Sequence, residues 1–104
     1  MELSFENNKS GNGGYITLKN SAEDVGRLTY TIVPELKKLI VSYVMVFPKF
    51  EGQGLGKKLV ARAEEIAKHH DKQKMTVTSG VGVRDYYRNL GYIFEPPYLV
   101  KKLV

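Results

Sequence analysis

The chain has 104 residues, no cysteine, a formal net charge of +5 and an isoelectric point near 9.4. This length supports one domain with a modest core, so we expect a single domain over residues 1–104. The lack of cysteine excludes disulfides and thiolate metal sites and is typical of a cytoplasmic protein. No apolar run approaches about 18 residues, and the start MELSFENNKS has no signal-peptide pattern, so no membrane association is expected.

Short strands are predicted in the first third of the chain. Residues 2–5 are interpreted as a strand, and residues 7–14, which are rich in asparagine and glycine, as a loop. Residues 15–19 and 26–33 have strand patterns separated by a turn, and we expect them to pair as a hairpin. In the second of these segments Leu28, Tyr30 and Ile32 recur at every second position, which predicts one buried face.

The rest of the chain alternates strand and helix patterns. Residues 39–47, LIVSYVMVF, are almost wholly apolar, as in a central strand that is covered on both faces. Residues 55–70 have the apolar spacing of an amphipathic helix. A strand is predicted at 74–79, a short helix at 83–90 that ends before Gly91, and strand-like segments around Pro96 and Pro97. This order indicates an α/β fold with a mixed sheet.

Three glycines, Gly52, Gly54 and Gly56, separate the apolar strand from the long helix, and Lys57 follows them. Glycine lets a backbone turn tightly and approach another group closely. Unpaired N–H groups and the dipole at a helix N-terminus favour an anion, so this turn is a candidate anion site. The spacing fits neither the phosphate loop nor the dinucleotide-binding fingerprint. The alternative is a helix entry with solvated lysines and no ligand.

Residues 41–60, VSYVMVFPKFEGQGLGKKLV, resemble the acetyl-CoA motif of the GNAT acetyltransferases. In that family a strand leads into a Gln/Arg-x-x-Gly-x-Gly/Ala turn, whereas Glu51 stands here at the Gln/Arg position. The resemblance implies that backbone amides of the turn hold the pyrophosphate of coenzyme A, and that the pantetheine arm lies near Met45 and Val46. The binding residues of the turn would be Gly52, Gln53, Gly54, Leu55, Gly56 and Lys57.

A second motif, at residues 79–98, extends this resemblance. Tyr87, Gly91 and Tyr92 fit the Tyr-x-x-x-Gly-aromatic frame of GNAT domains. The longer string is similar to the acetyltransferase domain of the Elongator catalytic subunit, whose family joins a radical-SAM domain to a GNAT domain and modifies wobble uridine in tRNA. Without cysteine, this chain has no ligands for the iron–sulfur cluster of a radical-SAM domain.

The resemblance also implies the fold: a mixed, mostly antiparallel sheet flanked by two helices. GNAT domains have two helices between their first two strands, but only a short turn separates residues 15–19 from residues 26–33. We therefore expect a compact version that lacks these two helices. The acceptor side would then be open, or completed by a partner chain such as the second copy in a homodimer.

Tyr87 is the candidate general acid. A phenol with a pKa of about 10 can protonate a departing thiolate whose pKa is about 8.5. Tyr86 is the alternative acid, and a purely structural role in the core is the alternative for Tyr87. His69 and His70 close the long helix, where capping is favoured over metal binding, and no metal site is expected.

A general base cannot be placed from the sequence. The apolar strand has no acid, and four carboxylates elsewhere cannot be assigned to the amine: Glu35, Glu51, Asp85 and Glu95.

Together these patterns predict an acetyl-CoA-dependent N-acetyltransferase, with acetyl-CoA as co-substrate and an amine of a small molecule or protein as acceptor. One alternative is a free-standing Elongator-like acetyltransferase domain that acts in tRNA wobble uridine modification, with tRNA as a partner. Another is a non-catalytic acyl-CoA-binding module. Four basic residues are candidates for contacts with RNA phosphates, but as scattered charges they define no RNA surface: Arg84, Arg88, Lys101 and Lys102.

Overall fold

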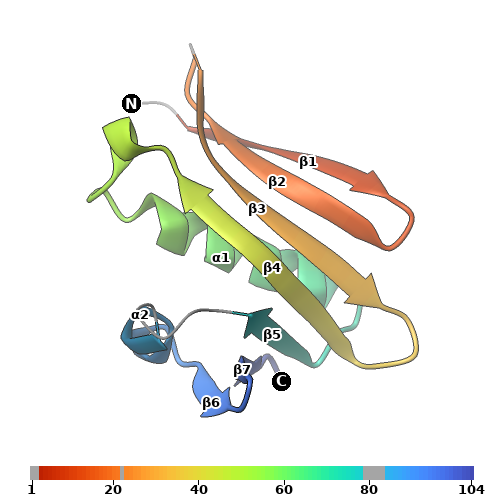
Figure 1. Cartoon of the computed structure of the whole chain (residues 1–104). Coiled ribbons are helices and arrows are strands. Elements are labelled where there is room, and N and C mark those ends of the chain that lie inside the picture. The colour runs from red at the N-terminus through yellow and green to blue at the C-terminus, as the bar shows by residue number, and fades with distance from the viewer. Residues whose placement is uncertain (1–2, 22, 79–83) are drawn as a thin grey trace.

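The computed structural model describes residues 3–21, 23–78 and 84–104, which form a seven-stranded sheet with two α-helices (Figure 1). The strands are β1 (Ser4–Ser10), β2 (Gly13–Lys19), β3 (Asp24–Val33), β4 (Lys38–Val46), β5 (Lys74–Thr78), β6 (Ile93–Glu95) and β7 (Tyr98–Lys102). The helices are α1 (Leu55–His69) and α2 (Arg84–Asn89), and a 3-10 turn, η1, covers Pro48–Phe50.

The sheet order is β1-β2-β3-β4-β5-β7-β6. All neighbouring strands are antiparallel except β4 and β5, which are parallel and are joined through α1. This mixed, mostly antiparallel sheet with two helices confirms the predicted fold class.

The first three strands form an antiparallel meander, and the predicted hairpin of β2 with β3 is confirmed. The predicted loop at residues 7–14 is wrong, because only Gly11 and Asn12 form a turn. Residues 7–10 pair along β2, and the Tyr30 hydroxyl donates a hydrogen bond of 2.8 Å to Asn7. Pairing with a neighbouring strand therefore outweighs the low strand propensity of asparagine. In the residues that the structure describes, no helix lies between these strands, as predicted for a compact version.

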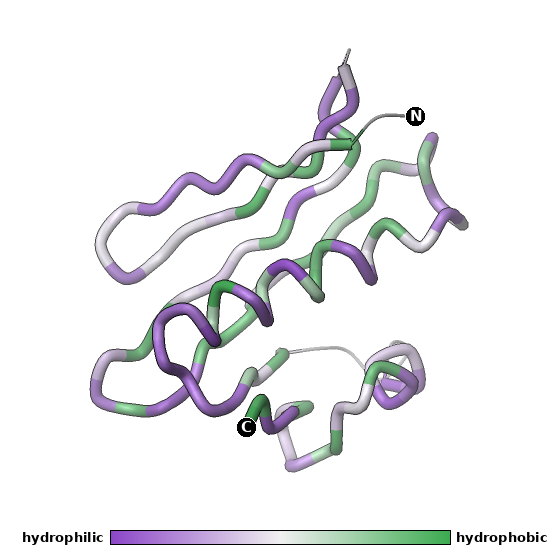
Figure 2. The backbone as a smooth tube through the Cα atoms, turned by 180° about the vertical axis from the view of Figure 1, so that it is seen from behind, coloured by the Kyte–Doolittle hydropathy of each residue, from purple (hydrophilic) through white to green (hydrophobic). Residues whose placement is uncertain are grey.

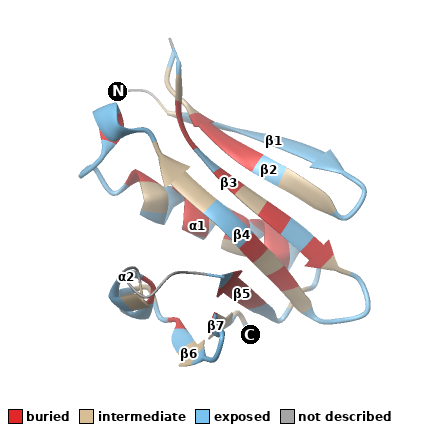
Figure 3. Cartoon of the chain, in the orientation of Figure 1, coloured by how far each residue is buried: buried red, intermediate tan, exposed pale blue. Residues whose placement is uncertain are grey.

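The core lies between α1 and one face of the sheet (Figure 2). The predicted amphipathic helix is confirmed, since its apolar positions are buried against β2 to β5. Figure 3 shows buried residues on β2, β3, β5 and α1, while β1 is exposed along its length. The buried helix residues are Leu55, Leu59, Val60, Ala63, Ile66 and Ala67. Within the described part of the chain, neither helix is long and apolar enough to cross a membrane.

One extra residue interrupts the pairing of β4 with β3. Tyr30 lies opposite Val41 and Thr29 lies opposite Tyr43, so Ser42 has no partner on β3. The Ser42 hydroxyl donates a hydrogen bond of 3.4 Å to the Thr29 carbonyl. This is a β-bulge, which bends a strand and re-aims its edge.

Apolar residues occur on both faces of β4, but only one of these faces lies against the core. Leu39 and Val41 are fully buried before it, and Val44 and Val46 pack against the same core after it. Side chains on the other face are more exposed, with Tyr43 at 51%. The prediction that both faces of this strand are covered is therefore wrong, because α1 covers only one of them.

Gly26 on β3 lies at a position that has no room for a side chain. A Cβ atom there would lie 2.7 Å from the Met45 carbonyl oxygen and 3.2 Å from a Leu59 methyl group. We expect Gly26→Ala to lower the free energy of unfolding by about 1–3 kcal/mol, as in other overpacked cores. Denaturant titration measures this loss. Gly13→Ala is the control, because its Cβ would meet no atom closer than 3.9 Å. An equal loss in both variants would contradict the steric argument.

Candidate active site

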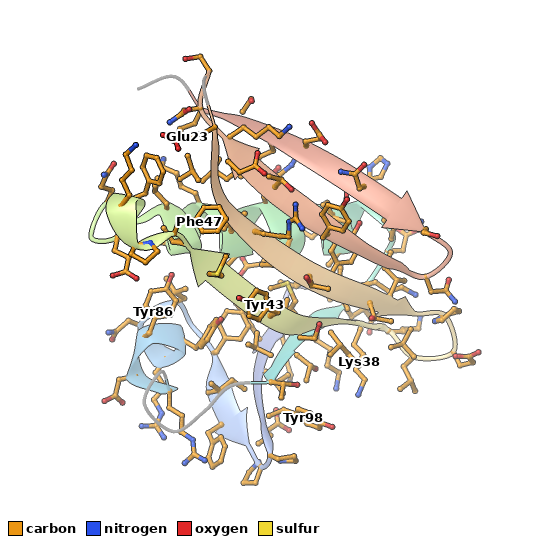
Figure 4. The ribbon with its side chains drawn as sticks, turned by 45° about the horizontal axis from the view of Figure 1, so that its top comes forward. Glu23, Lys38, Tyr43, Phe47, Tyr86 and Tyr98 are labelled. Atoms are coloured by element: carbon orange, nitrogen blue, oxygen red, sulfur yellow. The ribbon has the colours of Figure 1, made fainter. Side chains whose placement is uncertain are left out.

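A cleft of about 730 Å³ lies where β4 and β5 separate. The two strands pair only over residues 38–41 and 74–77, whereas β4 continues to Val46. Beyond Val41, backbone groups on this edge of β4 are therefore not paired with β5. In Figure 4, Tyr43 from β4 and Tyr86 from α2 come from opposite sides of the cleft. The lining residues are Ser42, Tyr43, Val44, Val46, Phe50, Glu51, Gly52, Gly54, Leu55, Gly56, Thr78, Tyr86 and Tyr87.

The glycine turn aims the N-terminus of α1 at this cleft. Gly52 and Gly54 have φ angles of 82° and 73°, in the left-handed region that favours glycine. Gly54 is the N-cap, no side chain caps the helix, and the Lys58 N–H donates to the Gly54 carbonyl. The N–H groups of residues 55–57 therefore have no partner within the helix. Such a helix start, with its dipole, is suited to an anion.

Six of the nine predicted site residues line the cleft: Val46, Gly52, Gly54, Leu55, Gly56 and Tyr87. The other three lie outside its lining. Met45 has its sulfur 3.0 Å from the Tyr43 hydroxyl, Gln53 is exposed in the turn, and Lys57 borders a neighbouring hollow with Glu64. The binding roles of all these residues stay predictions.

Glu51 is the carboxylate of the cleft lining. It lies directly before Gly52, so the departure from the family pattern places a negative charge beside the candidate anion site. The other acids considered from the sequence, Glu35, Asp85 and Glu95, are not in the lining. The structure therefore brings no carboxylate other than Glu51 into the described wall of the cleft.

The end of α2 fixes the position of Tyr87. The Tyr92 N–H donates to the Tyr87 carbonyl, and the Gly91 N–H donates to the Arg88 carbonyl, each at 3.0 Å. With Gly91 at a φ of 95°, these bonds form a Schellman motif, and the predicted helix end at Gly91 is confirmed. Val83, the first residue of the predicted helix, lies outside the described residues.

Side-chain contacts then hold the Tyr87 ring. Tyr87 is only 5% exposed, and it packs edge-on against Tyr92 and Tyr86, with ring centres 5.6 and 5.2 Å apart. The Tyr92 hydroxyl donates a 2.7 Å hydrogen bond to Glu64 on α1, and Lys101 donates to the same carboxylate. Glu64 lies among the polar residues of the amphipathic helix pattern. It is nevertheless partly buried, and it connects α1 to β7 and to the ring beside Tyr87.

Burial raises the pKa of Tyr87 to about 12, and the neighbouring Tyr86 adds to this effect. Tyr87 is therefore neutral at pH 7 and a weaker acid than predicted. The gap to a thiol with a pKa of about 8.5 corresponds to roughly 5 kcal/mol against full proton transfer. The hydroxyl is thus suited to stabilise a departing thiolate by hydrogen bonding, and it transfers its proton only where burial also raises the pKa of the thiol.

The raised pKa predicts that Tyr87 costs stability in alkaline solution. In the unfolded chain a tyrosine ionises near pH 10, so above that pH the unfolded state binds fewer protons than the folded state. The stability that depends on a protonated Tyr87 is fully present below pH 10 and is lost as the pH rises toward 12. We expect a decrease of about 1 kcal/mol in the free energy of unfolding between pH 9 and pH 11. Denaturant titration of wild type and Tyr87→Phe measures it, and an equal decrease in both would contradict the assignment.

Tyr86 reaches the glycine turn. It is 41% exposed, and its hydroxyl lies 3.0 Å from the position that a Cβ on Gly56 would take. Burial also raises the pKa of Tyr86. Both tyrosines line the cleft, but of these two only Tyr87 is enclosed by the core.

His69 and His70 lie at the end of α1. The helix end is closed by backbone hydrogen bonds, including one of 2.8 Å from the Lys72 N–H to the Ala67 carbonyl. Burial lowers the pKa of His70, so its ring is largely neutral at pH 7. Over residues 3–21, 23–78 and 84–104, no group of three or more potential metal ligands lies close enough to hold an ion.

The profile of the acetyltransferase (GNAT) family matches residues 1–92. The chain therefore belongs to the GNAT family of acetyltransferases, and the prediction of an acyltransferase enzyme is confirmed. Its fold is shared with the PaiA N-acetyltransferase of Thermoplasma acidophilum in complex with coenzyme A. That likeness has a TM-score of 0.75 and 20% identity, and covers 88% of this chain and 61% of that one.

Within this family the chain resembles Elongator complex protein 3. It is 52% identical to the Danio rerio protein over 56 residues, which cover 53% of this chain and 10% of that protein. It is 36% identical to the Bos taurus protein over 98 residues, which cover 86% of this chain and 18% of that protein. The tRNA uridine(34) acetyltransferase of Methanocaldococcus jannaschii is 49% identical over 55 residues, which cover 52% of this chain and 10% of that protein.

A solved archaeal Elp3 from Methanocaldococcus infernus has a TM-score of 0.77 and 27% identity, over 97% of this chain and 29% of that one. The predicted resemblance to the acetyltransferase domain of the Elongator subunit is confirmed. The match to the Danio rerio protein spans about a tenth of that protein's length.

Proposed function

We propose that the chain is an acetyl-CoA-dependent N-acetyltransferase that transfers an acetyl group to an amine. The observation that carries this proposal is the glycine turn, whose left-handed glycines aim the start of α1 into the cleft beside Tyr87. Membership of the GNAT family supports acetyl transfer, and the fold shared with a protein solved in complex with coenzyme A supports the choice of donor.

The cleft offers groups that fit the donor. The N–H groups of Leu55, Gly56 and Lys57 would hold the pyrophosphate, and the Lys57 ammonium would add a positive charge nearby. The unpaired edge of β4, from Ser42 to Val46, would hold the pantetheine arm through its backbone. The negative charge of Glu51 would repel the pyrophosphate and lower the affinity for coenzyme A. The residues of the cleft therefore fit coenzyme A, but they do not favour very tight binding.

Tyr87 would act where the leaving group departs. When bound, acetyl-CoA supplies a thioester whose cleavage releases a thiolate. Tyr87 holds a proton in a buried position at the cleft, and its ring is fixed by Tyr92 and Tyr86. No described residue forms a hydrogen bond with its hydroxyl, so the O–H is available to the leaving group.

The acceptor would approach from the uncovered face of β4. No helix covers Tyr43 on that face in the described part of the chain, so a bulky amine has access to the cleft. Amines are protonated at pH 7, and Glu51 is the carboxylate of the lining. Since Glu51 lies at the glycine turn, we propose that water takes up the amine proton.

A second candidate function is acetyl transfer in tRNA wobble uridine modification. The observation in its favour is the 49% sequence identity, over 55 residues, to the tRNA uridine(34) acetyltransferase of Methanocaldococcus jannaschii. A third, an acyl-CoA-binding module without catalysis, is favoured by Glu51 and by the lack of another carboxylate in the described lining.

One experiment separates these functions. Acetyl-CoA is titrated calorimetrically, and release of free thiol is then followed with a panel of amines and with tRNA. Micromolar binding with amine-dependent thiol release supports the N-acetyltransferase. Release that depends on tRNA supports the second function, and binding without release supports the third. If millimolar acetyl-CoA does not bind, all three are overturned.

A further inference from the structure

Three lysines form a row across the sheet. Lys38 on β4 lies opposite Lys74 on β5, and Lys74 lies opposite Lys102 on β7. Residues that lie opposite each other in neighbouring strands share a face, and the strands are about 4.8 Å apart. We call Lys38, Lys74 and Lys102 the lysine row. None of the three forms an ion pair with another described residue.

The lysine row faces away from α1. Leu39 and Met75, the next residues along β4 and β5, are fully buried on the face that α1 covers, so Lys38 and Lys74 point to the other face. A hollow of about 260 Å³ opens beside them, lined by Lys38, Lys74, Thr76, Glu95, Pro96, Tyr98 and Val100. Among the described residues of this lining, Glu95 is the one carboxylate, against two lysines.

Like charges directly opposite each other weaken a sheet. The sequence nevertheless places three ammonium groups on successive strands, where each repels the next. An anion that carries several regularly spaced charges would remove this repulsion at all three positions. A polyanion is therefore the ligand whose charge complements the row.

Exposed aromatic rings on the same face narrow the choice of polyanion. Tyr98 is 38% exposed, with its ring centre 6.0 Å from the Lys38 ammonium, and Tyr43, at the cleft, is 51% exposed (Figure 4). Lysines that contact phosphates, combined with rings on which bases stack, are typical of surfaces that bind single-stranded nucleic acid. An acidic peptide would use the charges but not the rings.

We propose that this open sheet face binds a single-stranded RNA segment, with its phosphates on the lysine row and its bases against Tyr98 and Tyr43. Tyr43 also lines the candidate active site, so a bound strand is led toward the cleft. That last step rests on the second candidate function, acetyl transfer in tRNA modification, whereas RNA binding itself does not. The sequence alone showed only scattered charges, because the row exists only once the strands are paired.

The test compares two variants that each lose three positive charges. Lys38→Gln/Lys74→Gln/Lys102→Gln removes the row, and Lys9→Gln/Lys58→Gln/Lys68→Gln removes exposed lysines of β1 and α1. Fluorescence anisotropy measures the affinity for a labelled single-stranded RNA of about 12 nucleotides. For three phosphate contacts, we expect the row variant to bind about 10- to 100-fold more weakly near 0.1 M salt. Its log–log salt slope should flatten by about 2. The control variant should change about threefold or less.

Two further measurements keep the result interpretable. Tyr98→Ala should weaken binding at least about fivefold through lost stacking. The affinity for acetyl-CoA is measured by calorimetry in the same variant. An unchanged affinity shows that the row variant is folded and that any loss of binding is specific to RNA. The proposal is overturned if the row and control variants bind RNA equally. It is also overturned if polyglutamate displaces the RNA as well as unlabelled RNA does and Tyr98→Ala has no effect, because the face would then suit an acidic protein.

Discussion

Tyr87→Phe is expected to lower kcat for acetyl transfer by about 100- to 1,000-fold, in the range of a lost general acid or transition-state donor. The variant loses the hydroxyl but keeps the ring contacts with Tyr92 and Tyr86 and the backbone bonds at Gly91. Binding of acetyl-CoA should therefore change less than about threefold. Steady-state release of free thiol measures kcat, and calorimetry measures the binding. Turnover at the wild-type rate would remove Tyr87 from the mechanism.

Tyr86→Phe is the matched control, because it removes the hydroxyl of the neighbouring ring, which lies at the glycine turn rather than in the core. A small change in kcat is expected. If Tyr86→Phe instead causes the larger loss, the role of acid passes to Tyr86. In wild type, the pKa of about 12 also predicts that ionisation of Tyr87 does not reduce kcat below about pH 11.

Gly54→Glu is expected to weaken acetyl-CoA binding by about 100-fold or more. A Cβ at Gly54 would meet no atom within 4 Å, so the new side chain does not clash with the protein. Its cost comes from the φ of 73°, which strains an L residue by roughly 1 kcal/mol, and mainly from a carboxylate at the candidate pyrophosphate site. Calorimetric titration with acetyl-CoA measures the loss.

Two variants separate charge from strain. Gly54→Ala introduces the strain without the charge and should cause a much smaller loss of affinity. Glu51→Gln removes a negative charge from the same part of the cleft and should strengthen binding severalfold. Wild-type affinity in Gly54→Glu would show that the pyrophosphate does not lie at this turn.

The parts of the fold that were predicted correctly have local causes. The helix α1 follows from apolar spacing, and the ends at Gly54 and Gly91 follow from glycines that take positive φ angles. The frame of Tyr87, Gly91 and Tyr92 has a local cause as well. In a Schellman motif the residue after the glycine bonds back to the helix residue five positions earlier, so the two aromatic rings meet. These signals are contained within a few residues of sequence.

The parts that were missed depend on partners far away in the chain. Residues 7–10 become a strand only because β2 is beside them. Glu64 has the position of a solvated helix charge, and its partner Tyr92 lies 28 residues further along. The lysine row depends on how three strands are aligned with one another. The residue pattern within a single strand does not reveal that alignment.

The extra residue in β4 has a further consequence for the site. Without Ser42, the remaining residues would alternate regularly, with Val41 and Val44 still toward the core and Tyr43 still outward. The core thus does not need this serine. The bulge lies directly after Val41, the last β4 residue that pairs with β5, so the strand bends at the point where the cleft opens. A single extra residue therefore stands where the sheet divides, and it bends β4 at the edge of the space proposed for the substrate.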